Sequence, residues 1–413
     1  MSLRNEHRSL FLALPLVAGA GCLTNQSGDL ATSKTGDLSN PLAERAAPDV
    51  EEVARCGAGG LRAGIQPAVV RAPYVQRISP SEGRIMWTEE PGDPAQVSVL
   101  QEDRAGAQLA RVAPSAAIDG TEPGGGALAY DAALDQLQPD TIYCYQLGDG
   151  DAALTSPAGF RTAPEPGGGA KISFVAFGDS GSGSADQMAI LEQLETVPFR
   201  FMIHTGDIAY ESGTMDQFEQ NYFAVYAPLI RSFAMFPSSG NHDEAEVYHQ
   251  VFDLPWADGA HNWYSFDYGD AHFVSLDTND VSDEQAAWLD QDLTANQREW
   301  TIVYGHHPAF SSGEHGSTAS VQDKLVPLFE RHGVDLVLAG HDHDYERIEP
   351  QNGVHYVVTG GGGRGTRPVG SSSFTAFSEQ VLNFVYVEIE GHQLVLHAID
   401  ATGEEFDQLA IDH

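Results

Sequence analysis

Gly206-Asp207-Ile208-Ala209-Tyr210 comes shortly after the apolar, strand-like run Phe201–Ile203. Four more polar motifs follow strand-like runs in the same way, and each contains a glycine. They are Gly178-Asp179-Ser180-Gly181, Gly240-Asn241-His242-Asp243, Val303-Tyr304-Gly305-His306 and Gly340-His341-Asp342-His343. In open α/β sheets ligands bind where the strands end, and glycine lets the backbone turn sharply there. The motifs therefore predict one polar site at the carboxyl ends of several strands.

The side chains in these motifs are carboxylates, imidazoles, an amide and a phenol, and no cysteine lies near them. Such donors suit iron, zinc or manganese rather than a metal that prefers thiolates. One motif alone is a weak signal, because Asp, Asn and His also form caps and turns. All the motifs together, in this order, predict a two-metal centre that hydrolyses a phosphate ester.

Strand-like and helical stretches alternate from Lys171 onward, which favours an α/β domain over residues 170–413. The predicted strands are 172–177, 201–203, 233–236, 273–276, 301–303, 336–338 and 356–358. The predicted helices are 186–196, 216–231, 283–296 and 321–332. Residues 384–399 have the pattern of a hairpin that turns at Glu390-Gly391.

Residues 66–164 carry β signals only, because short alternating runs are separated by Pro/Gly turns. The segment Leu137–Tyr145 resembles the corner of a fibronectin type III sandwich, where a tyrosine near a strand start bonds back to the preceding turn. Trp87 is then expected in the core, and residues 163–169 form the linker that follows. The expected N-terminal domain is an all-β sandwich.

Residues 1–21 have the layout of a secretory signal peptide, with Arg4 and Arg8 ahead of a short apolar run. Two cleavage sites fit. Ala18-x-Ala20 suits an ordinary signal peptidase, whereas Cys22 resembles the lipidated cysteine of a bacterial lipoprotein. Both predict an exported protein, periplasmic, at the cell surface or extracellular, with membrane contact only through a lipid anchor at Cys22. Residues 22–65 are expected to form a flexible tether.

The composition is strongly acidic, with 59 acidic and 21 basic residues and a formal net charge of −38. Such a surface repels nucleic acid and anionic membranes, so no nucleic-acid partner is expected. Cys56 and Cys144 lie beyond the leader, and both a disulfide and two free thiols are compatible with their spacing. Oligomeric state and natural substrate do not follow from the sequence.

The motif set resembles the calcineurin-like metallophosphoesterases, and among them the purple acid phosphatases. Other members of that superfamily have Asp-x-His in the first motif, whereas Gly181 stands at the histidine position here. Tyr210, in Gly-Asp-x-x-Tyr, matches the ligand that purple acid phosphatases use instead. The resemblance implies a sandwich followed by a four-layer α/β domain, in which two packed sheets are flanked by helices.

The resemblance also implies ligands for two metal ions. The first set, expected to hold Fe(III), is Asp179, Asp207, Tyr210 and His343. The second set, expected to hold Fe, Zn or Mn, is Asp207 as a bridge together with Asn241, His306 and His341.

Two histidines are expected on the substrate side of the metals. His242 resembles an outer-sphere histidine that stabilises the transition state or donates a proton to the leaving group. His315 resembles a second one, but Gly316 stands where plant-type enzymes have a further histidine, which leaves the general acid open. The run Gly360–Arg364 is expected to be a tight loop at the rim of the site.

The expected function is that of an acid-phosphatase-like, metal-dependent phosphoric ester hydrolase. Its substrates would be small phosphomonoesters, attacked by a metal-bound hydroxide. Two alternatives stay open at this point. One is a phosphodiesterase at the same two-metal site, and the other is a surface binding protein whose metal site is structural.

Overall fold

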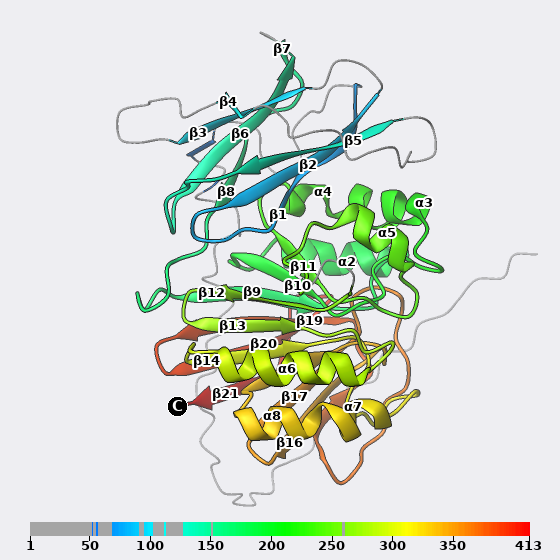
Figure 1. The fold of residues 1–413 in the computed structure, drawn as a ribbon. Coiled ribbons are helices and arrows are strands. Elements are labelled where there is room, and N and C mark those ends of the chain that lie inside the picture. The colour runs from blue at the N-terminus through cyan, green and yellow to red at the C-terminus, as the bar shows by residue number, and fades with distance from the viewer. Residues whose placement is uncertain are drawn as a thin grey trace, which may run out of the picture. The chain divides into compact units, whose positions relative to one another are not determined.

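The computed structural model describes Glu52, Arg55, Cys56 and residues 68–90, 95–101, 111–112, 127–149, 152–257 and 261–413 (Figure 1). All of these belong to one compact unit, Leu42–His413. The predicted signal peptide at 1–21, the lipid anchor at Cys22 and most of the predicted tether lie outside the described residues. Within the described ranges, no helix combines the length and the apolar character needed to cross a membrane.

The N-terminal part consists of two antiparallel sheets, as expected for a sandwich (Figure 1). One sheet contains β1 (Val69–Gln76), β2 (Gly83–Glu89) and β5 (Leu128–Leu134). The other contains β3 (Gln96–Gln101), β4 (Arg111–Val112), β6 (Ile142–Asp149), β7 (Ala152–Ala153) and β8 (Ala158–Arg161).

The predicted corner and core of this part are confirmed. Trp87 is buried, and the Tyr143 hydroxyl accepts a hydrogen bond from the backbone N–H of Gln138 at 2.7 Å. The tyrosine thus ties the start of β6 to the turn before it, as in the corner that the sequence resembles. The assignment of the two sheets to the fibronectin type III class itself stays a prediction.

A disulfide joins Cys56 to Cys144 on β6, so the pair is bonded rather than two free thiols. Four residues earlier in the chain, the buried Glu52 carboxylate lies 3.1 Å from Arg161 and 3.6 Å from Arg200. The segment predicted as a tether is therefore fixed to the folded protein at Glu52 and Cys56.

The catalytic part contains two further sheets. The six-stranded sheet has the order β11 (Met235–Pro237), β10 (Phe201–His204), β9 (Ile172–Phe177), β19 (Asn383–Glu390), β20 (Gln393–Asp400), β21 (Glu405–Asp412). The seven-stranded sheet has the order β12 (Tyr264–Tyr268), β13 (Ala271–Ser275), β14 (Trp300–Tyr304), β15 (Leu336–Ala339), β17 (Val354–Thr359), β16 (Tyr345–Gln351), β18 (Thr375–Glu379).

These sheets pack face to face, and helices cover their outer faces, which confirms the four-layer prediction. The ring of Phe273 on β13 lies 5.4 Å from Phe174 on β9 and 5.2 Å from Phe201 on β10, measured between centroids. Across the six-stranded sheet lie α2 (Ala185–Leu194), α3 (Met215–Phe218), the π-helix η2 (Glu219–Phe223), α4 (Ala224–Ile230) and α5 (Ala245–Val251). On the seven-stranded sheet pack α6 (Asp283–Ala295), α7 (Ala319–Lys324) and α8 (Val326–His332) (Figure 1).

Several elements differ from the sequence prediction. The expected helix 321–332 is two helices, because Pro327 lacks an N–H to continue the hydrogen-bond ladder of α7 and instead stands in the first turn of α8. The expected helix 216–231 includes the π-helical segment η2. The C-terminal hairpin is confirmed, but β21 adds a third strand to it that the acidic sequence Glu405–Asp412 concealed.

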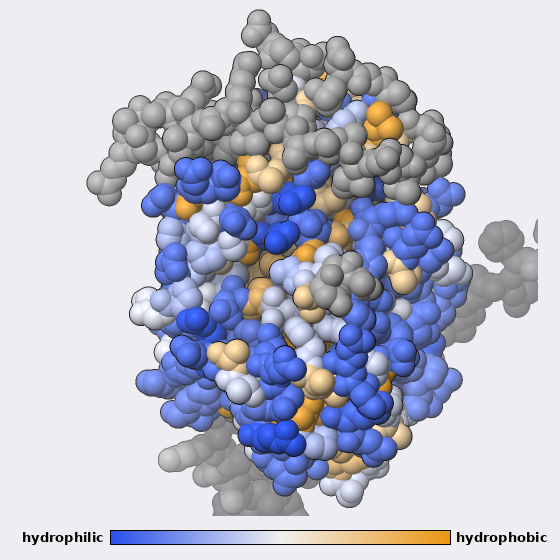
Figure 2. Space-filling model, viewed as in Figure 1, coloured by the Kyte–Doolittle hydropathy of each residue, from blue (hydrophilic) through white to orange (hydrophobic). Residues whose placement is uncertain are grey.

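The two parts of the chain share a continuous hydrophobic core and several buried polar contacts. Tyr74 on β1 donates to the Val251 carbonyl at 2.9 Å, and Tyr145 on β6 donates to the Arg231 carbonyl at 2.7 Å. Arg71 lies 4.0 Å above the ring of Phe223 and forms an ion pair with Glu219. The face seen in Figure 2 is mainly hydrophilic, in keeping with the acidic composition.

Candidate metal centre

Each of the motifs follows a strand, as predicted. Asp179, Asp207 and Asn241 come after the parallel strands β9, β10 and β11 of one sheet. His306 and His341 come after the parallel strands β14 and β15 of the other sheet. Because parallel strands end at the same edge, the polar side chains of both sheets meet in one place.

The four residues of the first predicted set meet at the Tyr210 hydroxyl. This oxygen lies 3.0 Å from Asp179 Oδ1, 2.7 Å from Asp207 Oδ2 and 3.2 Å from His343 Nε2. Asp179 Oδ1 and His343 Nε2 are themselves 3.4 Å apart. Four donor atoms of suitable type therefore surround a single small volume.

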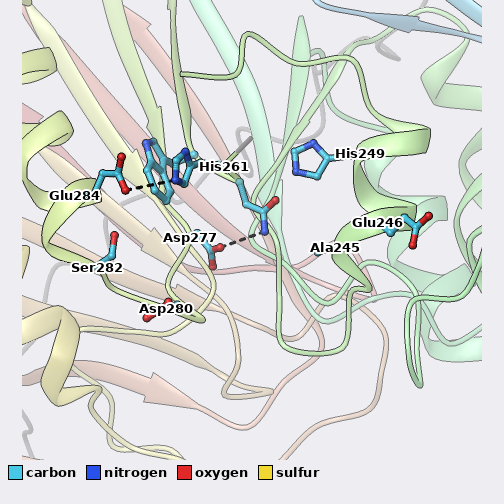
Figure 3. Close-up of a pocket in the computed structure, with 10 residues that line it drawn as sticks. Ala245, Glu246, His249, His261, Asp277, Asp280, Ser282 and Glu284 are labelled. Carbon is cyan, nitrogen blue, oxygen red and sulfur yellow. Dashed lines mark hydrogen bonds and ion pairs between the residues drawn. The ribbon is translucent and has the colours of Figure 1, made fainter. Parts of the chain in front are cut away.

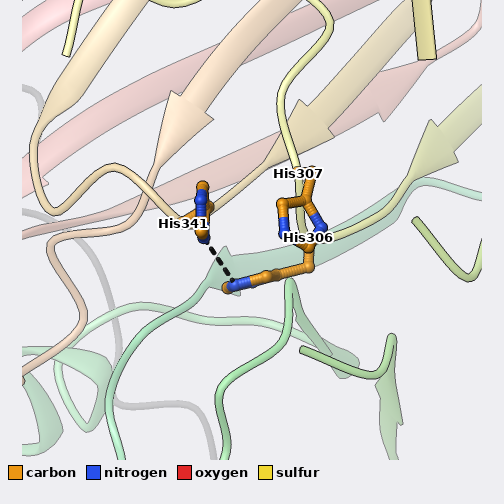
Figure 4. A group of neighbouring side chains, drawn as sticks. All are labelled: His306, His307 and His341. Atoms are coloured by element: carbon orange, nitrogen blue, oxygen red, sulfur yellow. Dashed lines mark hydrogen bonds between the residues drawn. The ribbon is translucent and has the colours of Figure 1, made fainter. Parts of the chain in front are cut away.

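The second predicted set meets at His306 Nε2. This atom lies 3.1 Å from Asn241 Oδ1, 3.2 Å from His341 Nδ1 and 3.4 Å from Asp207 Oδ1. Figure 4 shows His306 and His341 on neighbouring loops with their ring nitrogens directed at each other. Asp207 thus turns Oδ2 to the first set and Oδ1 to the second, which is the geometry that a bridging carboxylate requires.

Asp179, Asp207 and His341 all have left-handed backbone conformations, with φ values of 57°, 56° and 70°. Non-glycine residues rarely adopt this region, and each such residue costs on the order of 1 kcal/mol or more. Strain of this kind gathers where the surrounding structure must hold a side chain for function. Here it falls on three of the seven predicted ligands.

Gly181 has no room for a side chain, which explains the exchange of histidine for tyrosine. A Cβ atom at Gly181 would lie 1.7 Å from the carbonyl oxygen of Ile208. The Gly181 carbonyl instead accepts a hydrogen bond from the Tyr210 N–H at 2.7 Å, and this contact holds the tyrosine against Asp179. The close approach of the two loops therefore excludes a histidine at 181 and places the phenol at the first set.

The electrostatics of the donors fit a bound cation. Burial and the carboxylates of Asp179 and Asp207 raise the pKa of Tyr210 far above that of a free tyrosine. The phenol has one proton, yet two carboxylate oxygens lie within 3.0 Å of it, so the proton alone does not balance the negative charge. Burial, with His306, His307 and His315 nearby, lowers the pKa of His341 to about 2, so this ring is in the neutral form that binds metals.

Neighbouring groups hold these donors in place. His306 Nδ1 donates to the Thr205 carbonyl at 2.9 Å, so in the neutral ring Nε2 carries the lone pair, and this atom is directed at the centre. The buried Asp243 carboxylate accepts from the N–H groups of Ile208 at 2.8 Å and Gly240 at 2.9 Å, and so ties two of the loops together. The sequence pointed to no role for Thr205 or Asp243, since both contacts depend on the fold.

The two predicted substrate-side histidines border the centre on different sides. The ring of His242 lies 4.7 Å from the ring of Tyr210, and its Nδ1 donates to the Glu211 carbonyl at 2.6 Å. The exposed ring of His315 lies 4.2 Å from that of His341. The backbone N–H groups of His315 and Gly316 both bind the buried Asp342 carboxylate, at 2.7 Å and 3.2 Å.

Other histidines lie around the centre without belonging to the two predicted donor sets. His204 is fully buried and bonds Ser180 at 2.8 Å beneath the centre. His307 bonds Thr278 at 3.2 Å, although its ring nitrogens also lie near those of His306 and His341 (Figure 4). His249 and His261 line a separate cavity of about 420 Å³ beside α5, together with several acidic side chains (Figure 3).

Residues 172–345 match the family model for calcineurin-like phosphoesterases, so the chain contains a calcineurin-like metallophosphoesterase domain. The solved purple acid phosphatase from yellow lupin seeds has the same fold, with a TM-score of 0.73 and 21% identity over 83% of this chain and 74% of that one. The predicted resemblance to purple acid phosphatases is thereby confirmed.

Curated relatives point the same way. Tartrate-resistant acid phosphatase type 5 of Sus scrofa is 26% identical over 298 residues, which are 59% of this chain and 86% of that protein. An uncharacterized protein of Mycobacterium tuberculosis strain H37Rv is 27% identical over 273 residues, or 54% of this chain. The match covers only 51% of the mycobacterial protein, so the chain spans about half its length.

Asp207→Asn should abolish binding of both metal ions. Asparagine tolerates the left-handed backbone and keeps the size of the side chain, but it removes the charge that both donor sets share. Metal analysis of reconstituted and desalted protein measures the loss, and Asn241→Ala should lose the second ion alone. Asp290→Asn, at an exposed helix position, is the matched control. Two bound ions in Asp207→Asn would show that Asp207 is not the bridge.

Proposed function

We propose that this chain is an exported phosphatase that hydrolyses small phosphomonoesters at a centre for two metal ions. The observation that carries the proposal is the position of Asp207, whose two carboxylate oxygens each join a separate group of donors. A purely structural metal site needs a closed donor shell around one ion. Two adjoining sets that share a carboxylate instead match the arrangement of binuclear hydrolytic centres.

Two bound metal ions would bind the phosphoryl oxygens, neutralise developing charge and make a water molecule more acidic. The protein's own residues determine where this happens. Asp179, Asp207 and ionised Tyr210 would carry less negative charge than the positive charge of a trivalent and a divalent ion. The site would therefore attract a phosphate even though the chain as a whole is strongly acidic.

His242 is placed to act on the substrate rather than to bind a metal. Its backbone N–H donates to Asp207 Oδ1 at 2.9 Å, and its Nδ1 is engaged by the Glu211 carbonyl. Nε2 is thus the ring atom left for exchange of a proton with a leaving group. Gly316 has a φ of 74° and presents no side chain, so the further histidine of plant-type enzymes, which would follow His315, has no counterpart here.

The function is tested with protein reconstituted with metals. It should hydrolyse p-nitrophenyl phosphate faster than bis(p-nitrophenyl) phosphate, and a chelator should remove both activities together with the metals. A clear preference for the diester would identify a phosphodiesterase at the same centre. Stable binding of two metals without hydrolysis of either compound would favour the binding-protein alternative.

His242→Ala should lower kcat for alkyl phosphates on the order of 10²-fold while metal content stays intact, because it removes a donor that acts in the transition state. If His242 donates the proton, the loss should be smaller for nitrophenyl phosphates, whose leaving groups depart without help. His249→Ala, in the cavity beside α5, controls for removal of a nearby histidine. An unchanged kcat on both substrate types would exclude a direct role for His242.

We further propose Fe(III) in the first donor set and Fe, Zn or Mn in the second. A phenol among two carboxylates and an imidazole supports a hard, highly charged ion in the first set. Iron-loaded protein should absorb visible light through the tyrosinate, and Tyr210→Phe should remove this band while the protein stays folded. Iron-loaded, oxidised wild-type protein without colour would contradict the assignment of Tyr210.

The disulfide supports the exported part of the proposal. Cys56 and Cys144 are bonded, and such bonds persist in oxidising compartments outside the cytoplasm. Mass spectrometry of the N-terminus of protein isolated from its native cells would distinguish cleavage after Ala20 from lipidation at Cys22. An N-terminus at Met1 in mature protein would argue against export.

A further inference from the structure

A loop that follows β17 brings two arginines to the rim of the metal centre. The Arg364 N–H donates to the Asp179 carbonyl, and the Arg367 N–H donates to the His343 carbonyl, both at 2.8 Å. The loop is therefore fixed to the backbone of two predicted metal ligands. Only 21 of the 413 residues are lysine or arginine, so two arginines this close together are unusual in this chain.

The charge of Arg364 is already balanced. Its guanidinium lies 5.0 Å above the ring of Tyr210 and forms an ion pair with Glu211. Glu211 balances the charge of Arg364, and the ring of Tyr210 interacts favourably with the cation above it. Arg364 therefore serves chiefly to enclose the first donor set.

Arg367 differs, because its guanidinium binds an imidazole rather than a carboxylate. It donates a hydrogen bond to Nε2 of His315, and the described ranges contain no ion pair between Arg367 and a carboxylate, although its charge also acts on the buried Asp344. His315 in turn lies against His341 and is held at its N–H by Asp342. The half-buried Arg367 thus places a positive charge beside the second donor set, and no ion pair within the described ranges neutralises it.

Another part of the same sheet edge carries negative charge. The cavity in Figure 3 is lined by the connection from β13 to α6, by residues of α5 and by residues 261–263. Because β13 runs parallel to β14, this connection begins at the sheet edge from which His306 extends. Its lining includes four carboxylates, from Glu246, Asp277, Asp280 and Glu284. An anionic group on a leaving group would be repelled there and attracted toward Arg367.

We propose that Arg367 is a specificity-determining residue that binds a second anionic group on the substrate. The substrates it favours are phosphate esters or anhydrides whose leaving group itself carries a phosphate or a carboxylate. A guanidinium presents a planar fork of donors that matches both groups. This inference rests on the proposed function, since it assumes that the cleaved phosphate lies at the two donor sets.

Binding measurements on metal-loaded protein test the proposal independently of turnover. Calorimetry with orthophosphate and with pyrophosphate should show tighter binding of pyrophosphate to the wild type. Arg367→Gln should weaken pyrophosphate binding by about 10- to 100-fold, the usual cost of losing a charged hydrogen-bond donor, and orthophosphate binding by less than about threefold. Arg367→Lys should fall between the two, because it keeps the charge and loses the fork.

Arg331→Gln is the matched control, because Arg331 is an exposed arginine on α8 that pairs with Asp290. It should leave both affinities unchanged. Equal losses for orthophosphate and pyrophosphate in Arg367→Gln would overturn the proposal and place Arg367 at the cleaved phosphate. Unchanged binding of both would exclude any substrate contact. If the wild type binds both anions but hydrolyses no ester, the proposed function fails while the binding result still decides the role of Arg367.

Discussion

The centre depends on the sharing of one carboxylate between two groups of donors. Asp207 achieves this from a left-handed backbone position that its surroundings enforce. A Cβ atom at Gly240 would lie 2.1 Å from the Asp207 N, so the two loops approach as closely as glycine allows. The His242 N–H then fixes Oδ1 at 2.9 Å, and the Tyr210 hydroxyl fixes Oδ2 at 2.7 Å. Protein groups alone therefore orient both carboxylate oxygens of Asp207, one toward each donor set.

The two sheets contribute different chemistry to the site. Loops of the six-stranded sheet supply the oxygen donors, which are Asp179, Asp207, Tyr210 and Asn241. Loops of the seven-stranded sheet supply the imidazoles, which are His306, His341 and His343. Neither sheet alone offers a complete set, so the packing of Phe273 against Phe174 and Phe201 also sets the distances between donors. Metal binding should accordingly couple to the stability of the sheet interface.

The sequence was informative where function depends on local motifs. Five of the seven predicted ligands directly follow a glycine after a strand, and Tyr210 and His343 belong to the same motifs, so the motifs and the family resemblance together pointed to all seven without knowledge of the fold. The loops that hold these ligands depend on contacts between distant residues. Asp342 belongs to one of the motifs, but its hydrogen bonds to His315 and Gly316 could not be predicted from it. They form because the fold brings residue 342 to a loop that lies 27 positions earlier in the chain. The position of Arg367 was likewise hidden, because its hydrogen bond to His315 joins residues 52 positions apart in the chain.

Net charge and local charge act over different distances in this protein. At physiological salt, charges more than about 8 Å apart are largely screened, so the acidic surface repels an approaching phosphate only weakly. In the function proposed above, recognition would be decided at contact distance, by metal ions held in the two donor sets and by Arg367. An acidic exterior and an anionic substrate are therefore compatible, provided that the few positive groups are placed at the rim of the centre.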